Sequence, residues 1–593
     1  MSATAVVQHR LNLDAGHGRL YASGPSASAL LSLPGASMNA RRRSVELSLT
    51  LETLRAIRQT LDMTQEDMAS YCTSTLLRWA RAAGATEKLE QELHRRLGTG
   101  WRLDLPWEDT AGTHSPPFEH QRVMATVACT LDGSAFLCEM GTGKTRAALE
   151  AANYRVGNGS VHQVLVLCPR GVMGTWERET RRWAPHLIPV RLEGERKQTV
   201  PDRIAQMAAD TRKGVLFILN YEVIYRVREE LVAVAKGRKL GLVLDEGHKI
   251  RNPQASVTKT AMELARHIPW RLHMTGTPIL NGAQNIWSQW YGVDYGVTFG
   301  ANYFQFRREF FDEDRWGHDL TPKQGALDAI GLRMRRRGLR YRKVDCLDLP
   351  PKVYETQDVK LTDAQQAAYE QMAEELIAQL EPTSRPADGD EDRDAEGGGT
   401  ASAANQLVSI LRLMQITSGH IPNEEGEVHH FTPNPKLAAL VELVEENIQD
   451  HSIIVWAWYK EDIRALREAL SMYNPVVIAG GQKGRESDEA ELAFQEGRTR
   501  LLVGNPASGG LGRTLTAASM AVYYSQNYSL ENRQQSEDRC HRQGSQIHNR
   551  VTYVDLVCRD TVDEIVLGAL RDKKEVADVV VDLKRHLRGG TSG

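Results

Sequence analysis

Short apolar runs, each followed by a loop and then an amphipathic segment, recur along most of the chain. Apolar runs without polar alternation are typical of strands buried on both faces of a parallel sheet. Their alternation with helical segments predicts a doubly wound α/β architecture, in which ligand-binding loops follow the carboxyl ends of the strands. The runs lie at residues 164–168, 217–224, 241–245, 452–459, 475–480 and 500–504, and the 217–224 strand is expected to continue through Tyr221.

Residues 136–145, FLCEMGTGKT, are predicted to form a nucleotide-phosphate loop. Gly141 and Gly143 allow backbone N–H groups to come close to a triphosphate, which side chains would obstruct. The helix expected over residues 147–152 would direct its N-terminal dipole toward the same anion. The sequence therefore predicts that this loop binds ATP.

The side chains that follow the two glycines fit the same chemistry. Lys144 supplies a charge for the β- and γ-phosphates, and the Thr145 hydroxyl is placed to ligate Mg²⁺. Cys138 stands where the full motif has its first glycine, so a glycine-rich turn between a strand and a helix is the alternative. The residues expected to bind ATP here are Gly141, Thr142, Gly143, Lys144 and Thr145.

Two adjacent acids, Asp245 and Glu246, end the apolar run at 241–245. We expect Asp245 to hold Mg²⁺ and Glu246 to polarise the attacking water, because phosphoryl transfer needs both functions. A solvated acidic loop is the alternative. Together with Lys144, these two acids are the predicted catalytic residues of the first half of the chain.

Length and composition describe a large globular chain. Its 593 residues suggest about three to four domains. Apolar residues make up 41% and charged residues 25%. No apolar run approaches the ~18 residues of a membrane span, and the N-terminus has no signal-peptide core. We therefore expect a cytoplasmic protein.

The cysteines and the net charge exclude some classes of site. Seven cysteines are widely scattered without a CxxC pair, which favours reduced thiols over zinc, iron–sulfur or disulfide sites. The net charge is −3, and residues 388–396 contribute six acids and one arginine to it. Any surface that binds nucleic acid must therefore be local.

Residues 18–61 predict a small module of strand, helix, strand and helix, with the sequence LPG at its centre and arginines at 41–43. This unit resembles the HARP module of annealing helicases, although the aromatic residue expected around 44–46 is absent. Two alternatives are a helix-turn-helix over residues 54–72 and a helical cap with a solvated arginine run.

Three stretches carry a specific resemblance. LCPRGVMGTWERE at 167–179, DEGHKIRN at 245–252 and MTGTPILNGAQNIWS at 274–288 look like motifs Ia, II and III of the Swi/Snf-like branch of superfamily 2 ATPases. Gly247 stands where that family usually has alanine. The resemblance implies an ATP-driven motor that follows a DNA track. Because no bromodomain-like or chromodomain-like segment accompanies the compact core, we expect a nucleoid-associated protein of a bacterium or a phage.

Several further roles follow from this resemblance. Gln121, ahead of the phosphate loop, is expected to recognise the adenine edge. Thr275 and Thr277 are expected to join changes at the ATP site to the DNA track. In the first half of the chain the expected DNA contacts are Arg170, Trp176, Tyr221, Thr275 and Thr277.

The second half contains stretches similar to motif V, at residues 500–519, and motif VI, at 534–557. Gln535, Arg539 and Arg542 have the spacing that places both guanidiniums on one face of a helix. The resemblance implies that Gly512 and Gln535 bind ATP. It also implies that Arg539 and Arg542 act catalytically, as fingers that stabilise charge on the transferring phosphoryl group. A solvated basic helix is the alternative.

The segment between these two halves is basic and helical. Seven basic residues fall within residues 333–343, and Arg336 and Arg340 are the predicted DNA contacts, with a solvated face as the alternative. A helix is predicted over residues 361–380. The acidic residues 382–404 have the composition of a disordered loop inside a helical insertion, which could repel DNA or be inert.

The fold expected is α/β, with two RecA-like doubly wound parallel-sheet lobes, helical insertions and a small α+β or helical N-terminal module. The expected domains are 1–65 (N-terminal module), 66–115 (helical linker), 116–290 (lobe 1), 291–432 (insertions and bridge), 433–570 (lobe 2) and 571–593 (brace helix and tail). ATP would be hydrolysed in the cleft between the lobes.

The expected function is that of an ATP- and Mg²⁺-dependent DNA translocase, acting as a monomer on duplex or branched DNA. It would remodel or reanneal DNA, or displace bound protein, during replication, repair or recombination. Two alternatives stay open. One is an ATP-switched regulator of transcription that binds DNA and acts on a protein partner such as RNA polymerase. The other is a strand-separating helicase.

Overall fold

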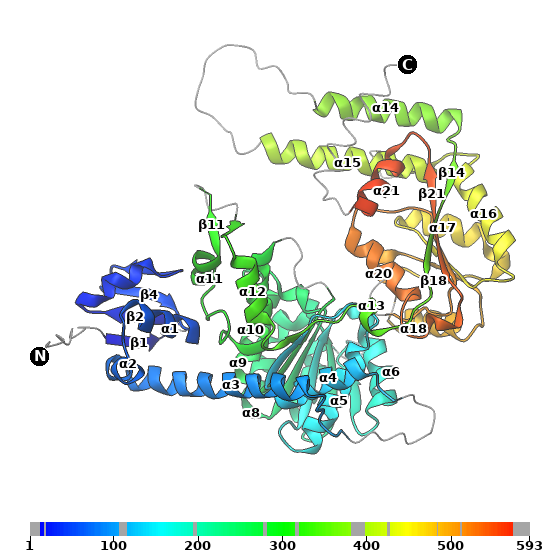
Figure 1. Ribbon diagram of the computed structural model, residues 1–593. Helices are drawn as coiled ribbons and strands as arrows, with labels where there is room; N and C mark the ends of the chain where they lie inside the picture. Colours follow the sequence, from blue (N-terminus) through cyan, green and yellow to red (C-terminus); the bar gives the residue numbers. More distant parts are fainter. Residues whose placement is uncertain are drawn as a thin grey trace, which may run out of the picture. The chain divides into compact units, whose positions relative to one another are not determined.

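The computed structural model describes residues 12–16, 19–105, 116–193, 199–276, 282–314, 320–380, 398–423, 427–482, 484–509 and 513–572. The chain divides into two compact units, Met1–Leu347 and Asp348–Gly593, and each contains a parallel sheet flanked by helices (Figure 1). Residues 291–432, expected as one stretch of insertions, are therefore shared between the two units.

The first unit begins with a small α+β module. Its antiparallel sheet has the order β1-β2-β4-β3, and its side chains share one apolar core with the helices that follow. The 54–72 segment, considered as a helix-turn-helix, packs against this sheet. The elements are β1 (Asn12–Gly16), β2 (Arg19–Ser23), the 3₁₀ turn η1 (Pro25–Ser32) in place of the first expected helix, β3 (Ser37–Asn39), β4 (Ser44–Ser48), α1 (Leu51–Thr60), α2 (Gln65–Tyr71) and α3 (Ser74–Gly98).

Lobe 1 of the first unit is built on a seven-stranded parallel sheet of order β13-β5-β10-β9-β6-β8-β7. Alternate residues of its interior strand β6 face two different apolar cores, as the unbroken apolar runs predict. The strands are β5 (Gly133–Phe136), β6 (Gln163–Cys168), β7 (Ile188–Arg191), β8 (Val215–Asn220), β9 (Leu240–Asp245), β10 (Trp270–Met274) and β13 (Gly338–Leu339).

Helices cover this sheet, and a smaller subdomain follows it. The covering elements are α4 (Glu119–Thr130), α5 (Lys144–Gly157), η2 (Arg170–Val172), α6 (Met173–Trp183), α7 (Val200–Ala209), η3 (Tyr221–Val227), α8 (Arg228–Gly237), η4 (Gly247–Ile250), α9 (Ser256–His267), η5 (Ala283–Asn285) and α10 (Ile286–Asp294). The subdomain contains α11 (Tyr303–Phe310), β11 (Phe311–Glu313), β12 (Leu320–Pro322), α12 (Ala326–Met334) and α13 (Lys343–Cys346).

Charged side chains fix α3 and the N-terminal module to lobe 1. Arg337 Nε lies 2.7 Å from Glu90 Oε1, and both side chains are almost fully buried. Arg336 Nη1 lies 2.6 Å from Glu52 Oε1 and 3.3 Å from Glu87 Oε1. Burial raises the pKa of Glu90 although Arg337 opposes the shift. The arginine-rich segment thus contributes to the packing of this unit.

The second unit contains lobe 2, whose parallel sheet has the order β14-β21-β20-β17-β19-β18. Its strands are β14 (Lys352–Val359), β17 (Ile453–Trp456), β18 (Val476–Ile478), β19 (Leu501–Gly504), β20 (Met520–Tyr523) and β21 (Val551–Cys558). The elements around it are β15 (His420–Pro422), β16 (Val428–His430), α16 (Pro435–Asn447), α17 (Lys460–Ala469), η6 (Ser471–Tyr473), α18 (Gly484–Gln495), α19 (Pro506–Gly509), α20 (Leu530–Cys540), η7 (Ser545–Ile547) and α21 (Val562–Asp572).

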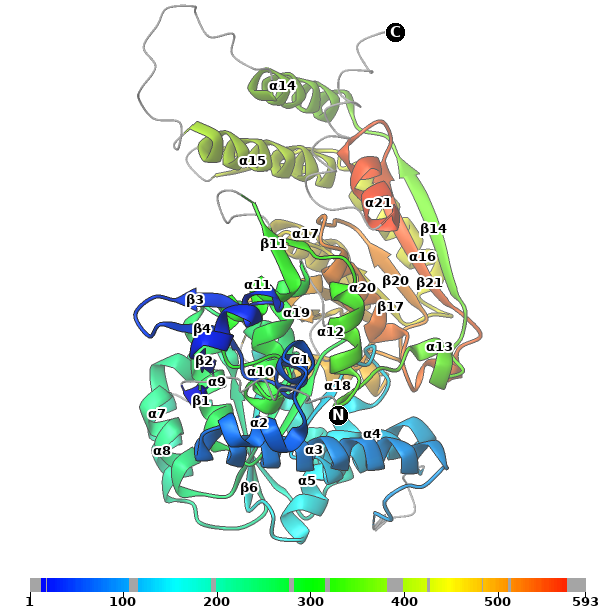
Figure 2. The same ribbon diagram turned by 60° about the vertical axis from the view of Figure 1, so that its left-hand side comes forward.

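Two long helices of the second unit, α14 (Asp363–Leu380) and α15 (Gly398–Ser418), run side by side in both views (Figures 1 and 2). The first confirms the helix predicted over 361–380. The second begins before residue 406, where the helix was expected to resume, so residues 398–404 of the expected loop are helical. Residues 382–397 of that loop lie outside the described residues.

All seven cysteines are free thiols, and five of them are buried. Among the helices of the described residues, none combines the length and the apolar composition needed to cross a membrane.

Removal of the carboxylate in Glu90→Ala should lower the unfolding free energy of the first unit by about 3 kcal/mol, because it leaves the Arg337 guanidinium buried without its nearest partner. Urea denaturation measures this effect. Glu92→Ala, which removes an exposed partner of Arg95 on the same helix, is the control and should leave the midpoint unchanged. Equal midpoints for the two variants would contradict the assignment.

Candidate functional site

Five neighbouring strands of lobe 1 end in residues that the sequence singled out. Because the strands are parallel, their carboxyl ends share one edge of the sheet. The phosphate loop follows β5, and Asp245 is the last residue of β9. Thr275 follows β10, which lies between those two strands. Arg170 and Tyr221 follow β6 and β8.

The phosphate loop has a backbone that requires its glycines. Gly141 and Gly143 have φ angles of 83° and 85°, in the left-handed region. A Cβ on Gly143 would lie 2.0 Å from Gln121 Nε2. That Nε2 donates to the Thr142 carbonyl at 3.3 Å, and the His120 ring contacts the same oxygen at 2.8 Å. Helix α4 therefore anchors the loop through His120 and Gln121, and recognition of the adenine edge by Gln121 stays a prediction.

Lys144 is the first residue of α5 and is buried. Its ammonium donates to the Cys138 carbonyl at 2.7 Å and to the Glu139 carbonyl at 3.1 Å. The charge is thus held inside the loop by carbonyl dipoles. Thr145 follows it in the first turn of the helix, half-buried, where the hydroxyl can serve a divalent cation.

Asp245 and Glu246 are both buried, with exposed fractions of 9% and 8%. The Trp176 indole donates to Asp245 Oδ2 at 2.8 Å, and the Glu246 N–H donates to Oδ1 at 3.1 Å. Burial and the neighbouring Glu246 charge nevertheless raise the pKa of Asp245 to about 6. Two adjacent buried carboxylates of this kind fit a divalent cation, which would compensate their repulsion.

Trp176 and Tyr221 differ from the expectation that they contact DNA. Their exposed fractions are 1% and 2%, so neither offers a surface to a DNA backbone in this structure. Trp176 instead supports the Asp245 carboxylate, and the Tyr221 hydroxyl donates to the Asp245 carbonyl at 3.0 Å. The strand expected to run through Tyr221 ends at Asn220, because Tyr221 opens the η3 turn.

A chain of contacts leads from Glu246 to the loop after β10. His248 Nδ1 lies 3.4 Å from Glu246 Oε2 and also 3.4 Å from the Thr275 hydroxyl. The side chains of His248 in motif II and Thr275 in motif III are thus in contact. Thr275 is fully buried, so it also differs from the expectation of a DNA contact and offers no surface to DNA in this structure. Thr277 lies outside the described residues.

The basic residues proposed for DNA binding differ in exposure. Arg170 and Arg340 are exposed. Arg336 is partly exposed and pairs with Glu52 and Glu87. Its charge is thereby compensated within the chain. DNA contacts by these residues stay a prediction.

The arginine-rich segment has a second role that the sequence analysis missed. Residues 337–341 hydrogen bond with the strand that leads into the phosphate loop, and the Glu139 N–H donates to the Tyr341 carbonyl at 3.0 Å. The Glu139 carboxylate accepts the Lys343 N–H at 2.8 Å. A two-residue strand gives no periodic signal, so the pattern could not predict this pairing.

In lobe 2, motif VI lies on α20 and in the turn after it. Arg539 Nη1 and Arg542 Nη1 donate to the same Arg513 carbonyl, at 3.3 and 3.1 Å. The two guanidiniums therefore lie close together, although they do not share one face of a helix as predicted, because α20 ends at Cys540 and Arg542 lies in the turn after it. Gln535 is buried and donates to Glu531 at 2.9 Å. Gly512 lies outside the described residues.

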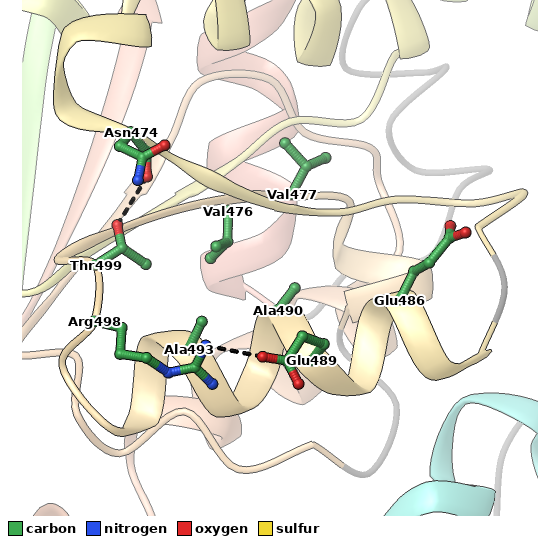
Figure 3. A pocket seen from close by; sticks show the side chains of 9 residues that line it. All are labelled: Asn474, Val476, Val477, Glu486, Glu489, Ala490, Ala493, Arg498 and Thr499. Carbon is green, nitrogen blue, oxygen red and sulfur yellow. Dashed lines mark hydrogen bonds and ion pairs between the residues drawn. The ribbon is translucent and has the colours of Figure 1, made fainter.

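Lobe 2 also has a cavity of about 400 Å³ between β18 and α18 (Figure 3). Its lining includes Arg498 and Glu489, which pair with each other at 2.8 Å. Asn474 and Thr499 lie at the amino ends of β18 and β19. The cavity therefore lies toward the amino ends of these strands. α/β proteins bind ligands at the opposite edge, in the loops that follow the carboxyl ends of the strands.

Comparison with known families gives two matches. The SNF2-related domain matches residues 119–416, and the helicase conserved C-terminal domain matches residues 435–544. Together they include the phosphate loop and Asp245 of lobe 1 and most of lobe 2, and end before β21.

Several individual proteins are similar to the chain. Protein p41 of Acyrthosiphon pisum secondary endosymbiont phage 1 is 25% identical over 79% of this chain and 99% of its own length. The TATA-binding protein-associated factor mot1 of Schizosaccharomyces pombe is 24% identical over 70% of this chain, which spans only 23% of that relative. Among solved structures, the SWI2/SNF2 ATPase core of Sulfolobus solfataricus in complex with dsDNA is 21% identical, with 77% of this chain and 91% of that chain covered and a TM-score of 0.34.

Trp176→Phe keeps an aromatic ring but removes the indole N–H that stabilises the ionised Asp245 carboxylate. The Mg²⁺ concentration that gives half-maximal ATP hydrolysis should rise about tenfold, as for other groups that support a metal ligand. Trp183→Phe, on the same helix but bonded to Glu179, is the control and should leave that concentration unchanged. An unchanged Mg²⁺ requirement in Trp176→Phe would remove Trp176 from this role.

Proposed function

The chain belongs to the SNF2-related family and is a DNA-dependent ATPase, and from this premise we propose that it is a motor that moves along duplex or branched DNA. The proposal rests on one observation: the His248 ring contacts both the Glu246 carboxylate and the Thr275 hydroxyl. These contacts connect the proposed site of hydrolysis with the loop that is expected to contact the DNA track. The proposed work is remodelling or reannealing of DNA, or displacement of bound protein.

The chemistry proposed for the site uses residues of lobe 1. The Lys144 ammonium exchanges its two loop carbonyls for the β- and γ-phosphate oxygens. Thr145 and Asp245 would hold Mg²⁺, which supplies charge compensation for the phosphates when bound. Glu246 accepts a proton from the attacking water. Because Glu246 is buried, bulk solvent is excluded from the surroundings of this water molecule.

The proposed DNA track begins at the exposed loops of the same edge. Arg170 and Arg340 are exposed and can neutralise phosphates, and Thr275 reports the state of Glu246 to this surface. Arg336 contributes once its carboxylate partners release it. Each phosphate contact adds to the salt dependence of DNA binding.

Glu246→Gln removes the proposed proton acceptor while keeping the shape of the side chain. ATP should still bind, and DNA-stimulated hydrolysis should be roughly 10²-fold slower. The parent should displace a triplex-forming strand from duplex DNA with ATP, whereas Glu246→Gln should not. Lys144→Ala serves as the comparison, because it should lose nucleotide affinity as well as rate.

The outcomes separate the possible functions. Near-normal hydrolysis by Glu246→Gln contradicts its assigned role. Triplex displacement by Glu246→Gln with bound ATP favours an ATP-switched DNA-binding regulator over a translocase. Unwinding of a forked duplex without triplex displacement favours a strand-separating helicase.

Arg542 is proposed to stabilise the charge that develops on the transferring phosphoryl group, with Arg539 ordering the same turn. Arg542→Lys keeps the charge and loses the planar fork. DNA-stimulated hydrolysis should fall at least about tenfold, because lysine keeps part of the roughly 10³-fold or larger effect of such an arginine, with little change in DNA binding measured without nucleotide. Hydrolysis at the parental rate would return Arg542 to a packing role.

A further inference from the structure

His273, on the interior strand β10, is a buried imidazole beneath the catalytic loop. It is 1% exposed, and in the parallel sheet it lies opposite Leu244, one position before Asp245. Burial lowers the pKa of His273 to about 4, so that the ring is neutral near pH 7. A neutral ring in this position adds volume to the core without adding charge beside the carboxylates.

Gly247 lies directly against this ring. A Cβ on Gly247 would lie 2.1 Å from Cε1, 2.5 Å from Nδ1 and 2.7 Å from Nε2 of His273. The φ angle of Gly247 is outside the left-handed region, so its backbone would accept alanine. The requirement for glycine is therefore imposed by the His273 side chain and not by the turn.

The residue before Gly247 is the proposed proton acceptor. Glu246 has a φ of 48°, which is uncommon for a residue other than glycine and indicates that its surroundings determine its conformation. The loop also contacts β10 through His248 and Thr275. Any movement of Gly247 away from the ring must therefore displace Glu246, His248 or both.

We infer that His273 is a positioning residue for hydrolysis. Its ring is the surface on which Gly247 rests, and this contact sets the position of the Glu246 carboxylate. His273, which directly precedes motif III, thereby determines the position of Glu246 in motif II by steric contact. The inference deepens the proposed function, because it rests on the role proposed for Glu246.

A mutant cycle between positions 247 and 273 tests the contact. Gly247→Ala should lower the DNA-stimulated kcat by about 10²-fold, the effect of displacing a catalytic group by about 1 Å, and leave the KM for ATP unchanged because the phosphate loop is separate. Adding His273→Ala should restore at least tenfold of that loss, because the new methyl group then occupies the space of the ring.

One control variant and one substitute variant complete the test. Gly237→Ala, at the end of α8 where a Cβ meets open space, should leave hydrolysis unchanged. His273→Val, with a β-branched side chain suited to a strand, replaces His273→Ala if the latter does not fold. Gly247→Ala should stay folded at the assay temperature and unfold in one cooperative thermal transition, shifted by at most the few degrees that overpacking costs, which separates a local displacement from a loss of folded protein. Losses that simply add in the double variant would overturn the inference.

The Glu246→Gln background identifies the path of the effect. With the carboxylate removed, Gly247→Ala should cause no further loss of the residual hydrolysis, because residues that act through one group are not additive. A further loss as large as in the parent would show that the contact does not act through Glu246. Rapid hydrolysis by Glu246→Gln alone would instead contradict the proposed function, so the two failures can be told apart.

Discussion

The nucleotide-facing edge of lobe 1 depends on how the Asp245 carboxylate is kept ionisable in a buried position. Burial next to Glu246 opposes its charge, and the Trp176 indole and the Glu246 N–H offset this with two hydrogen bonds. Both donors come from elements that are packed in the core. The position of α6, the left-handed backbone at Glu246 and the closeness of β10 therefore form one linked arrangement around a single carboxylate.

Much of this edge could be predicted, because it depends on local sequence. Uninterrupted apolar runs predict strands that are buried on both faces, and the polar residue at the end of each run must then lie at the carboxyl edge. The positions of Lys144, Asp245 and Thr275 follow from this rule. Arg539 and Arg542 also lie close together, but Arg542 follows the end of α20, so the turn after the helix and the Arg513 carbonyl bring the two side chains together.

What could not be predicted depends on partners distant in sequence. The burial of Trp176 and Tyr221 follows from an acceptor that lies far along the chain on β9. The edge strands β13 and β14 lie in segments that were expected to be insertions. These segments form strands because they pair with β5 and β21, which are distant in the sequence. The arginine-rich segment reads as a solvated or DNA-facing surface, yet Arg337 is buried against Glu90 of an N-terminal helix. The pattern of basic residues at 333–343 does not show which of them pairs with a carboxylate elsewhere in the chain.

The two carbonyls that hold Lys144 have a thermodynamic consequence for ligand binding. The loop is folded around its own cation, so that the glycines and the ammonium are already in place and little conformational entropy is lost on binding. A triphosphate must, however, displace the Cys138 and Glu139 carbonyls from the ammonium. The affinity of the site is therefore the difference between two sets of oxygen partners competing for one charge, rather than the full strength of the new set.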